Sequence, residues 1–323
     1  SFMKVFIDDG TTVKYALLIF SLIGLYAAIQ HWSILIDKFG SVPAVFLNAN
    51  RIYVLNTRGG VEGQIPFISN FGYVAIFFAA IYTGYKGRFT LLSFLPFIGI
   101  IIKELATLGR AGMLLAIMEF LFTFFLFRHL LTSEYNQRFK FSKKNAIISF
   151  TVLSVFFIAS ASLVRLSRGA TENYTGTNRS LMKFENNLIL SPSIYLYISS
   201  HIGVLNKYSS SDGENTGFGQ NTFLTAYHIF DKFGFLERPS DYQKGYFVPM
   251  WTNTGTYIRE LHADFGLLGI YLVPYLFGLV ITWLWLELKK KKSLIILTIL
   301  VYLYLIVGFS FLVIITRTSY WSI

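Results

Sequence analysis

The sequence predicts an all-α, polytopic integral membrane protein: a bundle of spanning helices with one large external loop. Hydrophobic residues make up 54% of the 323-residue chain and charged residues only 14%, well below the roughly 25% charged residues of soluble domains. A bilayer core about 30 Å thick needs about 20 apolar residues per helix, and the chain contains several runs of that length. The sequence has no cysteine, which excludes disulfide, zinc-thiolate and thiol-nucleophile chemistry.

Apolar runs predict seven membrane helices and set the domain organisation. The runs lie at about 13–29, 65–83, 89–108, 111–130, 146–164, 263–286 and 294–315. Short loops rich in Lys and Arg face the cytoplasm, which assigns residues 1–12, 84–88, 131–145 and 287–293 to the inside. We therefore expect N-terminal transmembrane helices in 1–164 with an external loop at 30–64, a large external loop with short helices in 165–262, and C-terminal transmembrane helices in 263–323.

The basic residues on the predicted external side are mostly arginines, which the rule for cytoplasmic loops does not explain. Arginine suits bidentate contacts with phosphate and carboxylate groups, so the external surface is predicted to meet an anion. A surface that is basic only because it faces anionic lipid headgroups is the alternative. The candidate anion-binding residues are Arg51, Arg58, Arg110, Arg165, Arg168, Arg259 and Lys103.

Four of these cations have a predicted helical context. Arg110 lies in the turn LGRAG at the start of a helix, and free backbone N–H groups at a helix start attract anions. Lys103 falls below the outer membrane edge and must face protein or a wet cavity, with Glu119 as a candidate partner in either a structural or a functional pair. Arg51 and Arg58 are seven residues apart and share a helix face, which also fits an interfacial helix with snorkelling cations.

A polar, ionisable stretch ends where a membrane helix begins. It reads WTNTGTYIRELHADFGLLG from Trp251 to Gly269. Neutral imidazole is a common general base near pH 7, so His262 is the first candidate for that role, with Glu260 and Asp264 as further candidates. A histidine that bonds the backbone at a helix start is the alternative.

Several common catalytic motifs are missing from the sequence. It contains no Walker loop, no HExxH zinc motif and no G-x-S-x-G elbow, and its predicted external side has no acidic pair for a metal–nucleotide complex. This argues against nucleotide-driven or metal-dependent chemistry outside the cell, so we expect neither a metal nor a cofactor. It favours an activated donor that arrives through the membrane, such as a polyprenyl diphosphate.

Two segments resemble a family of bacterial membrane enzymes. ATLGRAGML resembles the helix-opening turn of the oligosaccharide repeat-unit polymerases (the O-antigen polymerases, Wzy) and of the related O-antigen ligases. YIRELHADFGLLGIYLVPYLFGLV resembles the polymerases' later signature, in which a polar loop runs into DFG-x-x-G and then a membrane helix. The ligases have a histidine shortly before their own G-x-x-G helix, which His262 resembles. The likeness covers about residues 30–315 in architecture and in these short motifs. The family usually has more than seven spans, so further terminal helices are expected.

The resemblance implies a GT-C-like helical bundle in the bacterial inner membrane, with its active site facing the periplasm. Such an enzyme of lipopolysaccharide or similar surface-polysaccharide biosynthesis moves a glycan from undecaprenyl diphosphate to another lipid-linked repeat unit, by metal-independent glycosyl transfer. Donor and acceptor lipids are the expected partners, and the resemblance leaves open whether a chain-length regulator protein also binds. In this context the arginines and Lys103 contact the diphosphate and His262, Glu260 or Asp264 activates the acceptor. The expected sugar-binding residues are Tyr174, Tyr227, Tyr246, Trp251 and Asn253.

Two other function classes remain open from the sequence. An O-antigen ligase uses the same donor but moves the glycan to the lipid A core. A transporter of the lipid-linked oligosaccharide is a non-enzyme, and its charges are expected along a path through the helix middles, where this sequence has essentially Lys103 and Glu119.

Overall fold

The structure, a computed structural model, is mostly helical and contains helices suited to a membrane. It describes residues 10–48, 51–52, 68–107, 111–134, 144, 147, 151, 155, 192–211, 218–237, 239, 244–248, 251–252 and 255–311. Within these residues, four helical stretches are long and apolar enough to span a bilayer: Gly10–Phe39, Ile68–Lys86, Ala111–Leu130 and Tyr257–Lys291. The prediction of a helical membrane protein is confirmed at this level, with one small antiparallel strand pair in addition.

The chain divides into two compact units. The first comprises Ser1–Asn173 and Leu286–Tyr302, and the second comprises Tyr174–Trp285 and Leu303–Ile323. The polar stretch around His262 and most of the apolar helix that follows it therefore belong to the same unit.

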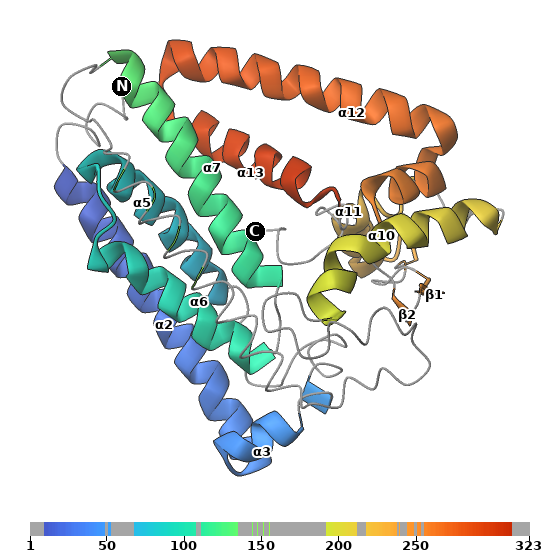
Figure 1. The fold of residues 1–323 in the computed structure, drawn as a ribbon, viewed down its shortest axis with the longest axis horizontal. Coiled ribbons are helices and arrows are strands. Elements are labelled where there is room, and N and C mark those ends of the chain that lie inside the picture. Colours follow the sequence, from blue (N-terminus) through green and yellow to red (C-terminus); the bar gives the residue numbers. More distant parts are fainter. Residues whose placement is uncertain are drawn as a thin grey trace. The chain divides into compact units, whose positions relative to one another are not determined.

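The first unit is built on four packed helices. Its elements are α2 (Gly10–Phe39), α3 (Val42–Leu47), the short 3-10 helix η1 (Ile68–Asn70), α5 (Phe71–Lys86), α6 (Leu91–Thr107) and α7 (Ala111–Glu134), and it also takes in the helical residues of Leu286–Tyr302. Helix α2 packs against α5 and α6, and α5 also packs against α7, so these helices lie side by side in Figure 1.

Glycines set the close approach of α2 to its neighbours. A Cβ atom added at Gly24 would lie 2.8 Å from the Cα atom of Gly72 on α5. Gly99 on α6 lies against the backbone of Leu25 on α2, where an added Cβ atom would be 3.6 Å from the backbone nitrogen. Small residues allow membrane helices to pack at backbone contact, where van der Waals attraction is largest.

Helix α2 is longer than the sequence analysis predicted. The predicted span ended at residue 29, but the helix continues to Phe39, so the first part of the predicted loop 30–64 is helical. Its continuation carries buried Leu35, which packs with Val45 and Ile52; this tertiary packing extends the helix. Of the predicted helix at 146–164, the structure describes residues 147, 151 and 155, which are helical.

The second unit contains the described part of the predicted external loop and the start of a spanning helix. Its elements are α10 (Pro192–Ser210), α11 (Leu224–Lys232), β1 (Tyr246–Phe247), β2 (Trp251–Thr252), most of α12 (Tyr257–Lys291) and the end of α13 (Leu294–Phe309). Strands β1 and β2 pair antiparallel. Val204 and Tyr208 of α10 and Tyr246 of β1 form a buried cluster against which Leu205 and Val248 pack.

Helix α12 is interrupted at Gly266, and Figure 1 shows the resulting bend. Gly266 has φ 65° and ψ −156°, a conformation open essentially to glycine alone. The helix begins at Tyr257 rather than near residue 263, so the polar stretch is itself helical up to the break. The apolar part follows the break, and Leu268 and Tyr271 are 77% and 75% exposed, as expected of side chains that face lipid.

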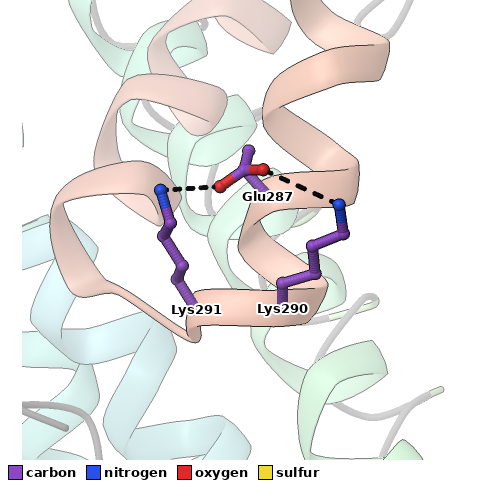
Figure 2. A network of polar contacts seen from close by, with 3 residues as sticks. All are labelled: Glu287, Lys290 and Lys291. Carbon is purple, nitrogen blue, oxygen red and sulfur yellow. Dashed lines mark ion pairs between the residues drawn. The ribbon is translucent and has the colours of Figure 1, made fainter.

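The last turn of α12 is basic and contains Lys289, Lys290 and Lys291. Glu287 lies 2.8 Å from the ammonium of Lys291 and 3.9 Å from that of Lys290, as Figure 2 shows. Both lysines are largely exposed, and exposed pairs of this kind contribute at most about 1 kcal/mol. Lys292 then adopts φ 47° and turns the chain into α13.

Candidate functional site

The polar start of α12 packs against the end of α10. His262 is half-buried, and its Nδ1 atom lies 2.8 Å from the hydroxyl of Tyr208. The two rings meet edge to face, with centroids 5.7 Å apart. A hydrogen bond at one ring nitrogen and an aromatic ring beside the imidazole fix its orientation, as a histidine in proton transfer requires.

Arg259 lies one turn before His262 and is only 1% exposed. Its guanidinium carbon is 5.0 Å from the centroid of the Tyr246 ring and 5.6 Å from that of Tyr208. One guanidinium nitrogen donates a 2.8 Å hydrogen bond to the carbonyl of Lys244. A guanidinium over two aromatic faces gains cation–π attraction, which is stronger when the groups are shielded from water.

Asp264 holds the turn that precedes α11. Its Oδ1 atom accepts hydrogen bonds from the backbone and side-chain amides of Asn221, at 3.0 and 2.8 Å. Its Oδ2 atom accepts from the backbone N–H and the hydroxyl of Thr222, both at 2.7 Å. Both carboxylate oxygens are therefore occupied by fixed donors, so the geometry gives Asp264 an anchoring contact.

The three candidate bases differ in accessibility. Glu260 is completely buried and Asp264 is 6% exposed, whereas His262 is half-buried. A base must come within hydrogen-bond reach of the proton that it removes. Of these three side chains, His262 is the one that a ligand can reach in this arrangement.

The predicted sugar-binding residues lie in different places. Tyr246 is 9% exposed and belongs to the aromatic cluster over Arg259. The Tyr227 hydroxyl donates a 2.6 Å hydrogen bond to the carbonyl of Phe218, which ties it to the turn before α11. The backbone of Trp251 forms β2, and Tyr174 and Asn253 lie outside the described residues.

Lys103 belongs to a separate, buried polar cluster in the first unit. Its ammonium lies 3.9 Å from a carboxylate oxygen of Glu104 and 4.9 Å from the centroid of the Tyr73 ring. A side chain at Gly112, near the start of α7, would collide with the Glu104 carboxylate and the Tyr73 hydroxyl. The predicted pairing of Lys103 with Glu119 is wrong, because the adjacent residue on α6 supplies the carboxylate.

Of the remaining predicted anion-binding residues, the structure describes only Arg51. Arg51 is exposed and helical, and it belongs to the first unit. The other predicted anion-binding residues lie outside the described residues: Arg58, Arg110, Arg165 and Arg168. The structure therefore brings His262, Arg259 and Tyr246 together among the predicted site residues.

Two residues of this cluster were missed in the sequence analysis. Tyr208 lies 54 positions before its partner His262, and Lys244 reaches Arg259 through a backbone carbonyl. The apolar segment at 187–205 predicted a short helix within the external loop, but Tyr208 lies beyond its end. A carbonyl contact leaves no trace in side-chain type, so no sequence signal pointed to Lys244.

Searches against protein-family models, curated proteins and solved structures found no match to this chain.

Proposed function

We propose that this membrane protein is a glycosyltransferase that polymerises undecaprenyl-diphosphate-linked oligosaccharide repeat units at the periplasmic face of the bacterial inner membrane. One observation carries the proposal. An oriented imidazole, His262, and a guanidinium, Arg259, share the ring of Tyr208 within two turns of the break at Gly266, where the apolar helix starts. A lipid-linked substrate keeps its tail in the bilayer and its reacting sugar just outside, at that level.

In this proposal His262 is the general base. Tyr208 engages Nδ1, so the tautomer with a proton on Nδ1 leaves the Nε2 lone pair for the acceptor. Nε2 removes the proton from a hydroxyl of the acceptor sugar as its oxygen bonds to the anomeric carbon of the donor. The bond from that carbon to the diphosphate oxygen breaks, and undecaprenyl diphosphate leaves. Arg259 is a positioning residue that holds Tyr208 and Tyr246 in place.

Negative charge that develops on the diphosphate needs cations nearby, and positioned cations are among the largest contributions to catalysis. We assign these contacts to arginines that the sequence puts on the external side, first Arg110, Arg165 and Arg168, and then Arg51 and Arg58. The aromatic residues Tyr174, Tyr227, Tyr246 and Trp251, with Asn253, are assigned to the sugars. Support for these assignments comes from residue type and sequence position.

The test is a polymerisation assay with the purified full chain in nanodiscs and a lipid-linked repeat unit as the only glycan. Wild-type protein should give a ladder of lengthened lipid-linked products. His262→Gln should reduce the rate by about 10²–10⁴-fold, the usual contribution of a general base, while His228→Gln on α11 serves as the matched control. A wild-type ladder from the His262 variant would refute the role of this residue, and no lengthening by wild-type protein would refute the proposed function.

Two further assays with the same lipid-linked donor distinguish polymerisation from the other function classes. Offered a lipid A core acceptor, a ligase would yield core-attached glycan without lengthening the lipid-linked unit. A transporter would move the lipid-linked unit across a vesicle membrane without altering its mass. Either result would replace polymerisation as the function of the chain.

A further inference from the structure

We propose that the end of α11 is a membrane-surface anchor that inserts phenylalanine side chains into the surface of the lipid bilayer. We call residues Ile229 to Leu236 the α11 tip. Its large apolar residues are all exposed, by 44–74%: Ile229, Phe230, Phe233, Phe235 and Leu236. Single exposed apolar side chains are ordinary on proteins, but a contiguous group marks an interaction surface.

The α11 tip is held in a defined conformation. The N–H of Gly234 donates to the carbonyl of Asp231 at 2.9 Å, and the N–H of Phe235 donates to the carbonyl of Phe230 at 3.0 Å. This pair of hydrogen bonds defines the Schellman motif at a helix C-terminus. In this motif the residue just after the helix cap adopts a left-handed backbone conformation. Gly234 has φ +72° and supplies that left-handed residue. The phenylalanines are therefore presented by a hydrogen-bonded turn.

The start of α11 is tied to the point where α12 enters the membrane. Asp264 bonds Asn221 and Thr222, which lie just before the first residue of α11. The ring of the next residue, Phe265, packs 5.0 Å from Phe218 and 6.3 Å from Phe223, measured between centroids. The break at Gly266 follows at once, and then the apolar helix begins.

The short length of α11 limits how far its tip can lie from the bilayer. Helix α11 has nine residues, which span about 13 Å at 1.5 Å per residue. The polar headgroup layers of a bilayer add about 5–8 Å on each side of its hydrocarbon core. A helix of this length that lies along the membrane surface keeps its exposed rings within that layer.

Lipid is the occupant that this surface fits. Asp231 within the tip and Glu237 just after it are exposed, and the sequence of the tip also contains Lys232. The tip therefore has charges of both signs and does not favour a strongly charged protein partner. Amphipathic segments with Phe and Leu on one side bind in the headgroup layer by burying that side. A second copy of this chain or another protein is an alternative occupant, which the experiment below distinguishes.

The chain has no cysteine, so single-cysteine variants need no further background changes. Phe233→Cys and Phe235→Cys, each carrying a nitroxide label, are compared in lipid nanodiscs with Phe247→Cys on β1, which is similarly exposed at 54%. Collision of the label with oxygen, which concentrates in lipid, and with a water-soluble nickel complex is measured by power saturation. Both tip labels should show an oxygen-to-nickel accessibility ratio several-fold above that of the Phe247→Cys label.

Two results would overturn the proposal. Tip labels as accessible to the nickel complex as the control label would place the tip in water. Tip labels that are immobilised and shielded from both reagents would place a protein surface over the tip. Melting temperatures equal to that of the wild-type protein confirm that the cysteine variants fold, so either result bears on the tip itself. The experiment is independent of the glycosyltransferase proposal, because it measures position and not activity.

Discussion

The hydroxyl of Tyr208 lies 2.8 Å from Nδ1 of His262, and the ring of Tyr208 also lies under the guanidinium of Arg259. One tyrosine thus contacts both the proposed general base and the arginine that holds the tyrosine in position.

Tyr208→Phe should slow polymerisation and leave the protein folded. The ring and its stacking under Arg259 remain, but the hydrogen bond that orients His262 is lost. We expect kcat to fall by about 10-fold or more, less than on removal of the base itself, with little change in KM. Steady-state kinetics in nanodiscs measure this, with Tyr271→Phe, a 75% exposed position on α12, as the matched control. Equal kcat values for the two variants would contradict an orienting role.

Arg259→Lys should behave as a disruptive substitution despite its conserved charge. Lysine lacks the planar guanidinium that stacks on two rings while donating a directed hydrogen bond, and Arg259 makes these contacts while 99% buried. We expect the free energy of unfolding to fall by about 1–3 kcal/mol, the usual cost of a buried hydrogen-bonding group left without a partner. The apparent melting temperature in detergent is the measurement, and an unchanged value would show that charge alone suffices at this site.

Asp264→Ala should loosen the turn before α11. Asp264 accepts from two buried or half-buried backbone N–H groups and two side chains, and each buried donor left without a partner costs about 1–3 kcal/mol. Hydrogen–deuterium exchange should therefore rise at the amides of Asn221 and Thr222. Asp231→Ala, on the exposed surface of α11, is the control and should leave exchange there unchanged.

Comparing Gly266→Ala with Gly278→Ala separates the effect of backbone strain from that of a steric clash. An added Cβ atom meets nothing within 4 Å at either position, but only Gly266 has a positive φ. Gly266→Ala should cost about 1–3 kcal/mol of stability through backbone strain, whereas Gly278→Ala should be neutral or slightly stabilising because alanine favours helix. Equal melting temperatures for the two variants would mean that the break at Gly266 does not exist in the membrane.

Acid should weaken the second unit through His201 of α10. Burial lowers the pKa of His201 below its usual 6.5, and its ring packs 5.8 Å from that of Phe311. As pH falls below about 6.5 the unfolded chain takes up the proton first, so stability is lost as pH approaches the lower pKa of the folded state. The melting temperature should fall between about pH 7.5 and 5.5, and His201→Leu should reduce that fall. An equal fall in the variant would exclude His201 as its cause.

Composition and apolar run length were enough to predict a helical membrane protein, because spanning helices must be about 20 apolar residues long. They could not place the end of α2, whose last ten residues are helical because Leu35 finds partners in α3 and beyond. The density of ionisable groups beside an apolar run pointed to residues 259–264, where the structure places the contacts of Arg259, His262 and Asp264. The contact with Tyr208 was not, since it joins residues 54 positions apart through packing that local periodicity does not encode.

The crossing of α2 and α5 at Gly24 and Gly72 has a consequence for motion. A Cβ atom added at Gly24 would lie only 2.8 Å from the opposing Cα atom, so the two backbones already touch and any side chain at this position would push the helices apart. We expect this helix pair to move as a rigid body, so that any rearrangement of the first unit takes place in the segments attached to it.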